Sequence, residues 1–176
     1  MACDYFLKID GIDGESQDDA HTNEIEIASF RWSEKQPGTF QRNGSGGHTG
    51  GKVQMGNFVF TMPTCKASPK LFLACAKGDH IPTSTLTCRK AGGGQQEFFK
   101  ITLSEVLVSH YETASTDGDG SSDNDGTTLG FHDGSPLDRV ELAFGKIECE
   151  YRPQKSDGSL DNPVKAGYNL VNNKPV

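Results

Sequence analysis

The segment most suggestive of chemistry is residues 46–52, which read GGHTGGK. It fits the first seven positions of a phosphate-binding loop, in which backbone amides and a lysine hold phosphates and a following hydroxyl binds magnesium. Here the hydroxyl position is Val53, and a strand rather than a helix is expected next, so the helix N-terminus that binds the anion is missing. We therefore predict no nucleotide site, and a nucleotide hydrolase using residues 46–52 stays the weakest alternative function.

A second candidate is the acidic run DGDGS at residues 117–121, which begins like a calcium-binding loop. A helix–loop–helix calcium site has glycine at its sixth position and a bidentate glutamate at its twelfth. Those positions are Ser122 and Thr128. The run predicts a solvated loop, and weak opportunistic calcium binding stays open.

The cysteines and histidines, five of each, are scattered along the chain. No CxxC pair or closely spaced Cys/His cluster provides the ligands of a zinc site, and there is no Gly-x-Ser-x-Gly elbow for a nucleophile. The thiols are expected to be reduced and to act mostly as small buried apolar groups. We predict a protein that is not an enzyme and has no cofactor and no metal.

The net charge limits the kinds of molecule that the protein can bind. Seventeen basic against 24 acidic residues give a net charge of −7, which repels nucleic-acid phosphates and anionic membranes. The longest apolar run, at residues 71–76, is far shorter than the ~20 residues of a transmembrane helix. Asp4 stands where a signal peptide has basic residues. We expect folding in the cytoplasm, with no nucleic-acid partner and no membrane insertion.

The elements that would position any site are mainly strands. The 176 residues include 21 glycines, which disfavour long helices, and the length suits one domain spanning residues 1–176. The apolar parity changes between Ile27 and Ala28, which indicates a bulge or a strand buried on both faces, and Gly145 indicates a second bulge. Strands are predicted at residues 5–9, 24–27, 28–32, 57–62, 83–90, 97–103, 106–111 and 137–151. Because only residues 104–105 separate them, 97–103 and 106–111 are either two strands or one bent strand.

One helix is predicted over Ser68–Lys77. Ser68 suits the N-cap, Pro69 the first helical position, and Gly78 the left-handed position after the helix. The apolar face would consist of Leu71, Ala74 and Cys75, extended by Phe72 and Ala76.

The remaining segments are polar and rich in glycine. We predict flexible loops at about 37–52 and 115–135, a hairpin loop at 91–95, and an irregular tail over 152–176, in which Tyr168, Leu170 and Val171 could add a last strand. The fold class is mainly β, with one short helix and long glycine-rich loops.

Several short segments follow one another in an informative order. They are YFLKI at 5–9, GES at 14–16, His21, EI at 24–25, FRW at 30–32, GGKV at 50–53, SP at 68–69, KAGG at 90–93, ITL at 101–103, VLVS at 106–109 and YRPQK at 151–155. In this order they resemble the Hcp family, the haemolysin-coregulated tube proteins of the bacterial type VI secretion system. The resemblance extends from residue 5 to the tail.

The resemblance implies a compact β-barrel of two packed sheets that assembles as a hexameric ring. Such rings stack into a tube inside a contractile sheath, hold effector proteins in the lumen, and leave a Gram-negative cell without a cleavable signal peptide. The implied partners are further copies of the chain, secreted effectors, and the sheath and spike components of the apparatus. The alternative is a monomeric accessory domain that binds one protein partner.

Two candidate sites follow. Phe30 and Trp32 share one strand face, so the Arg31 side chain points to the opposite face. We predict that Arg31 faces the lumen and contacts effectors there. The alternative is an arginine on the outer surface with no binding role. The resemblance also implies that the loop after residue 40 contacts neighbouring subunits and the next ring. Its residues are Gln41, Arg42, Asn43, Gly44, Ser45, Gly46, Gly47, His48, Thr49, Gly50, Gly51 and Lys52.

Overall fold

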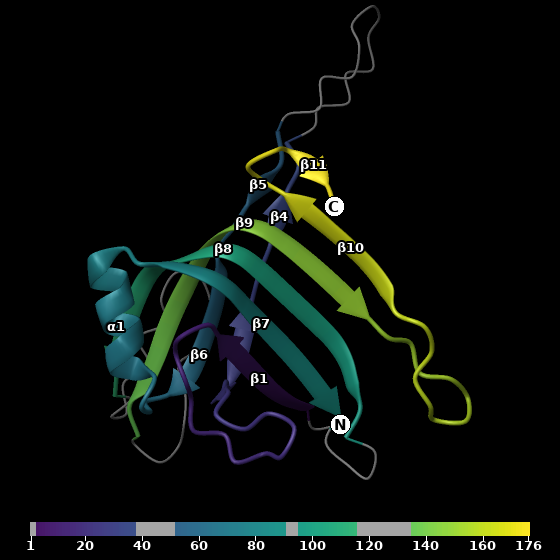
Figure 1. The fold of residues 1–176 in the computed structure, drawn as a ribbon, viewed down its shortest axis with the longest axis horizontal. Coiled ribbons are helices and arrows are strands. Elements are labelled where there is room, and N and C mark those ends of the chain that lie inside the picture. Colours follow the sequence, from purple (N-terminus) through teal and green to yellow (C-terminus); the bar gives the residue numbers. More distant parts are fainter. Residues whose placement is uncertain (1–2, 38–51, 91–94, 116–134) are drawn as a thin grey trace, which may run out of the picture.

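The computed structural model describes residues 3–37, 52–90, 95–115 and 135–176. Strands dominate these residues, with one short helix on one side of the sheet (Figure 1). The predicted mainly β class is therefore confirmed. The predicted loops at 37–52 and 115–135 and the hairpin loop at 91–95 lie almost entirely outside the described residues.

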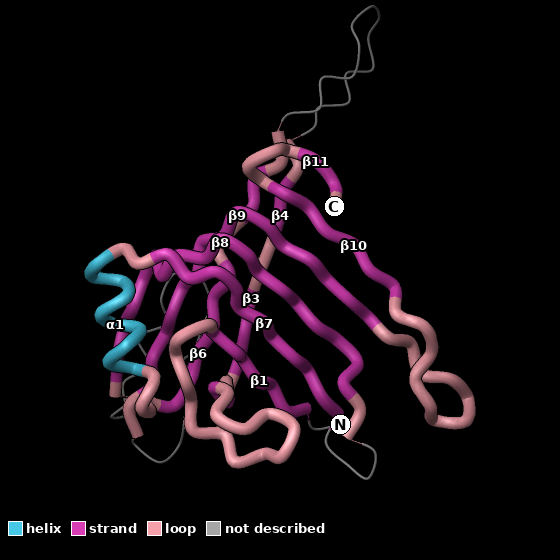
Figure 2. Tube along the Cα trace, viewed as in Figure 1, coloured by secondary structure: helices cyan, strands magenta, loops and turns pink. Residues whose placement is uncertain are grey.

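Figure 2 shows the strands in magenta and the helix in cyan along the chain. They are β1 (Cys3–Ile9), β2 (Ile25–Glu26), β3 (Ser29–Arg31), β4 (Glu34–Lys35), β5 (Gln54–Met55), β6 (Phe58–Pro63), α1 (Ser68–Lys77), β7 (His80–Lys90), β8 (Glu97–Ala114), β9 (Leu137–Tyr151), β10 (Val164–Asn169) and β11 (Lys174–Pro175).

Most strands join one antiparallel sheet in the order β11-β10-β9-β8-β7-β1-β2, and β4 pairs with β5 in a separate two-stranded ribbon. β9 pairs with β8 along its length. Its other edge is shared, since residues 137–142 pair with β6 and residues 146–151 pair with β10. The sheet therefore divides at β9 into two branches.

The expected closed barrel is not formed, because the described sheets do not close. The chain between residues 25 and 31 changes its pairing partner: the amide of Ile27 still donates to the Tyr5 carbonyl at 3.1 Å, and the next amide, of Ala28, donates to the Thr61 carbonyl at 2.8 Å. β2 therefore belongs to β1 and β3 to β6. This change of partner explains the shift of apolar parity between Ile27 and Ala28.

The core is formed by alternate apolar side chains of these strands. Phe58, Phe60 and Met62 of β6 are fully buried, and Val140 and Leu142 of β9, whose partners lie on β6 and β8, are equally buried. Period-two alternation is expected for strands with one face on a core, so the sequence pattern indicated these core positions correctly.

β8 is a single strand of 18 residues, as the short gap at residues 104–105 allowed. Glu105 has a positive φ of 55°, and its side chain lies against Gly145 of β9, where an added Cβ would be 2.3 Å from Glu105 Oε2. Gly145, which has no side chain, therefore leaves room for the Glu105 side chain where β8 departs from regular strand geometry. The predicted bulge at Gly145 is wrong in position, because the register shift lies between Val108 and His110 of β8.

The helix has the predicted ends, and Gly78 adopts the expected left-handed conformation, with φ of 67°. The N-cap is Ala67 rather than Ser68, because the Ser68 hydroxyl is buried and donates to the Asp138 carboxylate. Leu71 and Ala74 face the core, but Phe72 is 58% exposed, so the predicted widening of the apolar face is wrong. The tail contains β10 and β11, so it is more regular than predicted; the strand allowed for at Tyr168 is present as β10, but it ends at Asn169, before Leu170 and Val171.

Candidate functional site

Arg31 ends β3 and is exposed. Its neighbours Phe30 and Trp32 pack against the core, and the Phe30 ring stacks on Phe58 at a centroid distance of 5.9 Å. The alternation predicted from the sequence therefore describes the local geometry, and Arg31 lies on the face opposite these aromatic rings. Across the sheet it pairs with Val59 of β6.

Of the predicted assembly loop, residues 41–51 lie outside the described residues, and Lys52 is exposed. The described base of this loop is the β4–β5 ribbon, with Lys35 paired to Gln54. A pocket of about 250 Å³ lies between this ribbon and the C-terminal hairpin, lined among others by Lys52 and Tyr168. The structure thus brings Lys52 close to the C-terminal hairpin. Arg31 belongs to a different pair of strands.

The segments that resembled a phosphate-binding loop and a calcium loop lie almost wholly in the undescribed stretches 38–51 and 116–134. Within the described ranges, no group of three or more His, Cys, Asp or Glu side chains could hold a metal ion. No helix in this part of the chain is long and apolar enough to cross a membrane.

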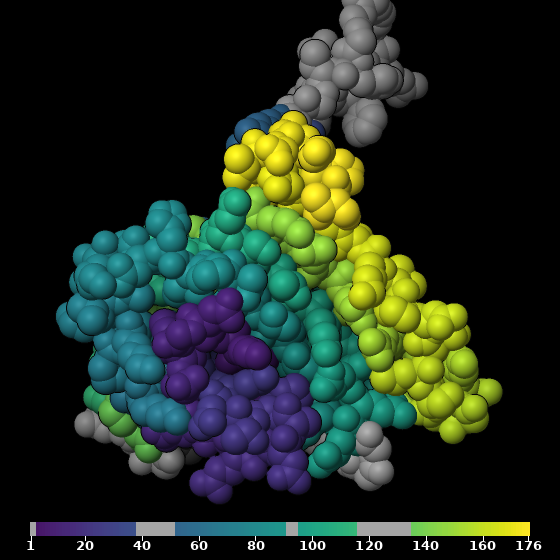
Figure 3. Space-filling view, in the orientation of Figure 1, coloured from purple at the N-terminus to yellow at the C-terminus, as the bar shows by residue number. Residues whose placement is uncertain are grey.

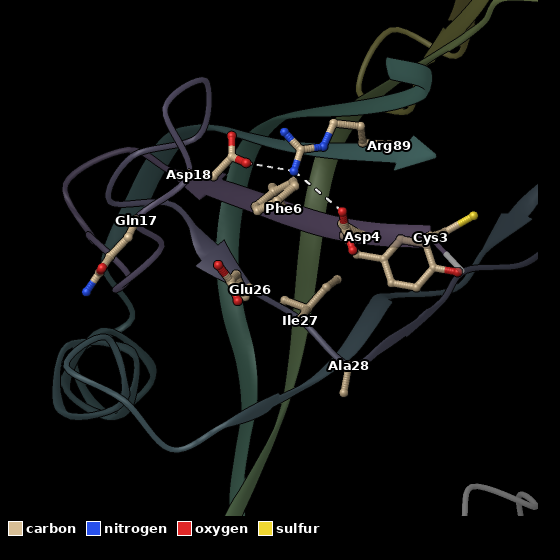
Figure 4. Close-up of a pocket in the computed structure, with 10 residues that line it drawn as sticks. Cys3, Asp4, Phe6, Gln17, Asp18, Glu26, Ile27, Ala28 and Arg89 are labelled. Carbon is tan, nitrogen blue, oxygen red and sulfur yellow. Dashed lines mark hydrogen bonds and ion pairs between the residues drawn. The ribbon is translucent and has the colours of Figure 1, made fainter. Parts of the chain in front are cut away.

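The most elaborate polar cluster surrounds Arg89 near the end of β7 (Figure 4). This side chain is 6% exposed, and its Nη2 atom lies 2.7 Å from Asp18 Oδ2 and 3.4 Å from Asp4 Oδ2. The guanidinium carbon lies 4.8 Å from the centroid of the Phe6 ring, a cation–π contact. A buried charge needs such partners, because desolvation without them is costly.

The charges of this cluster reinforce one another. The hydrogen bond from Arg89 lowers the pKa of Asp18 below its usual value, and the hydrogen bond to Asp18 in turn raises the pKa of Arg89. Both groups are therefore held in their charged forms. Their hydrogen bond connects residues 10–24, called the β1–β2 segment below, to β7, and the two residues are 71 positions apart in the sequence.

His21 extends the cluster. Its ring stacks on Phe6 with a centroid distance of 4.2 Å and an interplanar angle of 7°. Nδ1 lies 2.9 Å from Glu24 Oε2, and Nε2 lies 3.4 Å from Glu97 Oε1 on β8. His21 and Glu24 belong to the segments that carried the family resemblance, and the structure shows Glu24 bound to the His21 ring, whose other nitrogen lies next to Glu97 of β8.

Sequence reasoning did not single out Arg89, Asp18 or Phe6. The available signal was a cation at the end of the strand pattern TSTLTCRK, next to a buried position. Its partners lie about 70 to 85 residues away, and no local spacing connects them.

The comparisons with known proteins agree along nearly the whole chain. The family model described as "Type VI secretion system effector, Hcp" matches residues 6–151. Protein hcp1 of Pseudomonas aeruginosa is 40% identical over 175 residues, which cover 98% of each chain. The crystal structure of Hcp1 from Salmonella typhimurium is 34% identical over 100% of both chains, with a TM-score of 0.73.

Two further solved structures are similar at 28% identity. One is a type six secretion system protein with a TM-score of 0.84, covering 99% of this chain and 100% of its own. The other is a type VI secretion system effector from Yersinia pestis with a TM-score of 0.70, covering 94% of this chain and 99% of its own.

The fold is therefore that of type VI secretion system proteins, a mainly β architecture with one helix. Within that class, the chain belongs to the Hcp family.

Proposed function

We propose that this protein is a structural subunit of the type VI secretion tube, which forms hexameric rings that stack and carry effector proteins in the lumen. The observation that carries the proposal is the match to Hcp proteins along essentially the entire chain, from both sequence and structure. A tube subunit acts through complementary surfaces rather than through a reaction, and a head-to-tail contact that closes on itself gives a ring.

Arg31 is proposed to face the lumen and to contact effectors. Its exposure, combined with the packing of Phe30 and Trp32 against the core, supports this role. A long cation projecting from a lumen wall narrows the cavity and attracts acidic cargo surfaces.

The segment Gln41–Lys52 is proposed to contact the neighbouring subunit and the next ring. Support comes from its glycine content, since glycines let a segment adopt the backbone conformation that a partner requires. Deleting residues 43–50 should then weaken ring closure or stacking more than folding of the monomer. The sheath and spike components of the apparatus are the further partners proposed, and export through that apparatus requires no cleavable signal peptide.

Native mass spectrometry tests the assembly. A ring has the mass of six subunits of 19.0 kDa each, whereas a monomeric binding domain, the alternative, has the mass of one. Analytical ultracentrifugation over a range of concentrations checks that the ring exists in solution. Subunits that remain monomeric at all concentrations would contradict the proposal.

A further inference from the structure

Two surfaces at opposite ends of the molecule carry opposite charge. One, the acidic seam, consists of Asp4, Asp18 and Glu26 around a pocket beside β1. The other, the basic end, consists of Lys35, Lys52 and Lys174 on and beside β4, β5 and β11. Figures 1 and 3 show β11 at one end of the molecule and the N-terminal segment, in purple, at the other.

The acidic seam exists because the strand pairing stops short. β2 pairs only with Phe6 and Leu7 of β1, and after the Ile27–Tyr5 hydrogen bond the chain departs toward β6. The pocket left between the first half of β1 and residues 26–28 measures about 480 Å³ (Figure 4). An uncovered strand edge of this kind is a site where another chain can pair.

The charge within the seam is not balanced by the described residues that line it. Three carboxylates face one guanidinium, that of Arg89, whose Nη2 atom binds Asp4 and Asp18. The Nε atom of Arg89 is buried and makes no hydrogen bond within the described residues. Glu26 is exposed, and its carboxylate is not one of the two bound by Nη2. The excess of carboxylates favours a cationic side chain of an incoming partner, and the Arg89 Nε–H is left as a donor for an acceptor of that partner, such as a backbone carbonyl.

The basic end has the complementary charge in a chain whose net charge is −7. Lys35, Lys52 and Lys174 are all exposed, and the acidic Glu34 precedes Lys35 in the same strand. Lys35 belongs to the ribbon from which the proposed assembly loop departs, and Lys52 is the last residue of that loop. Val171, next to β11, is 69% exposed and adds apolar surface.

We propose that the basic end of one copy docks into the acidic seam of the next copy. The contact joins two different surfaces of the same chain, which is the head-to-tail type; such a contact gives a ring when the rotation between successive copies closes and an open filament when it does not. Lysine ammonium groups would approach Glu26 and the outer oxygens of Asp4 and Asp18. The inference rests on the proposed ring and identifies the surfaces that close it.

Two charge reversals test the contact separately. Glu26→Lys makes the seam less acidic, and Lys174→Glu makes the opposite end less basic. Each variant alone should raise the protein concentration needed for half-assembly by about tenfold or more, because like charges then face each other. Lys8→Glu and Asp13→Lys, exposed charges outside both surfaces, are the matched controls and should assemble like the unaltered protein.

Mixing the two variants is the decisive step. In an alternating ring, every contact joins either two unaltered surfaces or two reversed ones, so an equal mixture should restore six-subunit particles with three copies of each variant. Glu26→Lys and Lys174→Glu each change the mass of the chain by only about 1 Da, so one of the two variants is labelled with ¹⁵N, and native mass spectrometry then resolves these compositions. Glu26→Gln, which only removes the charge, gives a smaller loss of assembly and serves if Glu26→Lys does not fold.

The outcomes separate the two proposals. If the unaltered protein forms six-subunit particles but the variants assemble equally well, or the mixture does not recover, the docking contact is wrong and the ring stands. If the unaltered protein forms no ring, both fail.

Discussion

The backbone carbonyl of Glu24 lies directly against the α-carbon of Gly14. A Cβ at position 14 would be 2.3 Å from that oxygen and 2.5 Å from the Ile25 α-carbon. The amide of Gly14 also donates to the Asn23 carbonyl at 2.7 Å, and the amide of Ser16 donates to Glu24 at 3.1 Å. The two stretches of the β1–β2 segment are therefore packed backbone to backbone, which leaves no room for a side chain.

Gly14→Ala should lower the free energy of unfolding by about 3 kcal/mol or more, because the obstructing atoms belong to backbone that cannot turn aside. Gly11→Ala is the matched control: its φ is +80° and no heavy atom lies within 4 Å of the added Cβ, so only about 1 kcal/mol of backbone strain is expected. Urea denaturation of both variants measures the difference. Equal losses would show that close packing at Gly14 is unimportant.

The Asp138 carboxylate is fully buried and bound by hydroxyl groups of Ser68, Thr64 and Thr113 from three different segments. Asp138→Ala leaves the buried Ser68 hydroxyl without its acceptor and removes an acceptor from the exposed Thr64 and Thr113 hydroxyls, so a loss of about 2–4 kcal/mol is expected. The comparison variant is Asp157→Ala in an exposed turn, for which the loss should be about 1 kcal/mol or less. Calorimetry on the two proteins decides; similar melting temperatures would contradict the importance of the buried carboxylate.

Acid should weaken the fold partly through Asp18. The hydrogen bond from Arg89 holds the pKa of Asp18 below its ordinary value of 3.8 in the folded protein. Its contribution to stability is therefore fully present above the unfolded pKa and is lost as pH falls through the lowered value. Asp18→Asn should flatten the fall in melting temperature between pH 5 and pH 3, whereas Asp13→Asn should keep the original slope. An unchanged slope in Asp18→Asn would rule out this coupling.

The Cys88 thiol should be unreactive in the folded protein. Burial, with a smaller effect from Cys3, raises its pKa to about 12, and the thiolate is the form that reacts with alkylating reagents. At pH 8, labelling of Cys88 followed by peptide mass spectrometry should be at least about a hundredfold slower in the native than in the urea-unfolded protein. Rapid native labelling would mean that this part of β7 opens readily.

Arg31→Ser should change which effectors co-purify with the protein while the ring remains intact. Arg31 is exposed, and its removal leaves Phe30 and Trp32 in the core, so the melting temperature should shift by less than about 2 °C. Quantitative mass spectrometry of the co-purified proteins measures the cargo. An identical cargo set from intact rings would remove Arg31 from the proposed lumen contact.

Local patterns predicted those parts of the fold that depend on local physics. The ends of the helix follow from Pro69 and Gly78, and the core positions of β6 follow from period-two alternation. The cap was mispredicted because Ser68 had a better partner in Asp138, which lies 70 residues further along the chain. Tertiary contacts outweighed a local preference at that position.

The polar cluster could not be predicted in the same way. Arg89, Asp18 and Phe6 come from β7, a connecting segment and β1, and only the pairing of β1 with β7 brings them together. The open edge of β1 at the acidic seam likewise depends on where the pairing of β2 with β1 stops. The sequence indicated an irregularity between Ile27 and Ala28, but it did not indicate that the chain changes its pairing partner there.

Negative-stain electron microscopy of the purified chain is the most direct test of the central claim, that this protein assembles as a tube subunit. The proposal predicts class averages with sixfold symmetry and a central hole, together with end-to-end stacks at high protein concentration. Fields of compact particles the size of a single 19.0 kDa chain, without rings at any concentration, would contradict it.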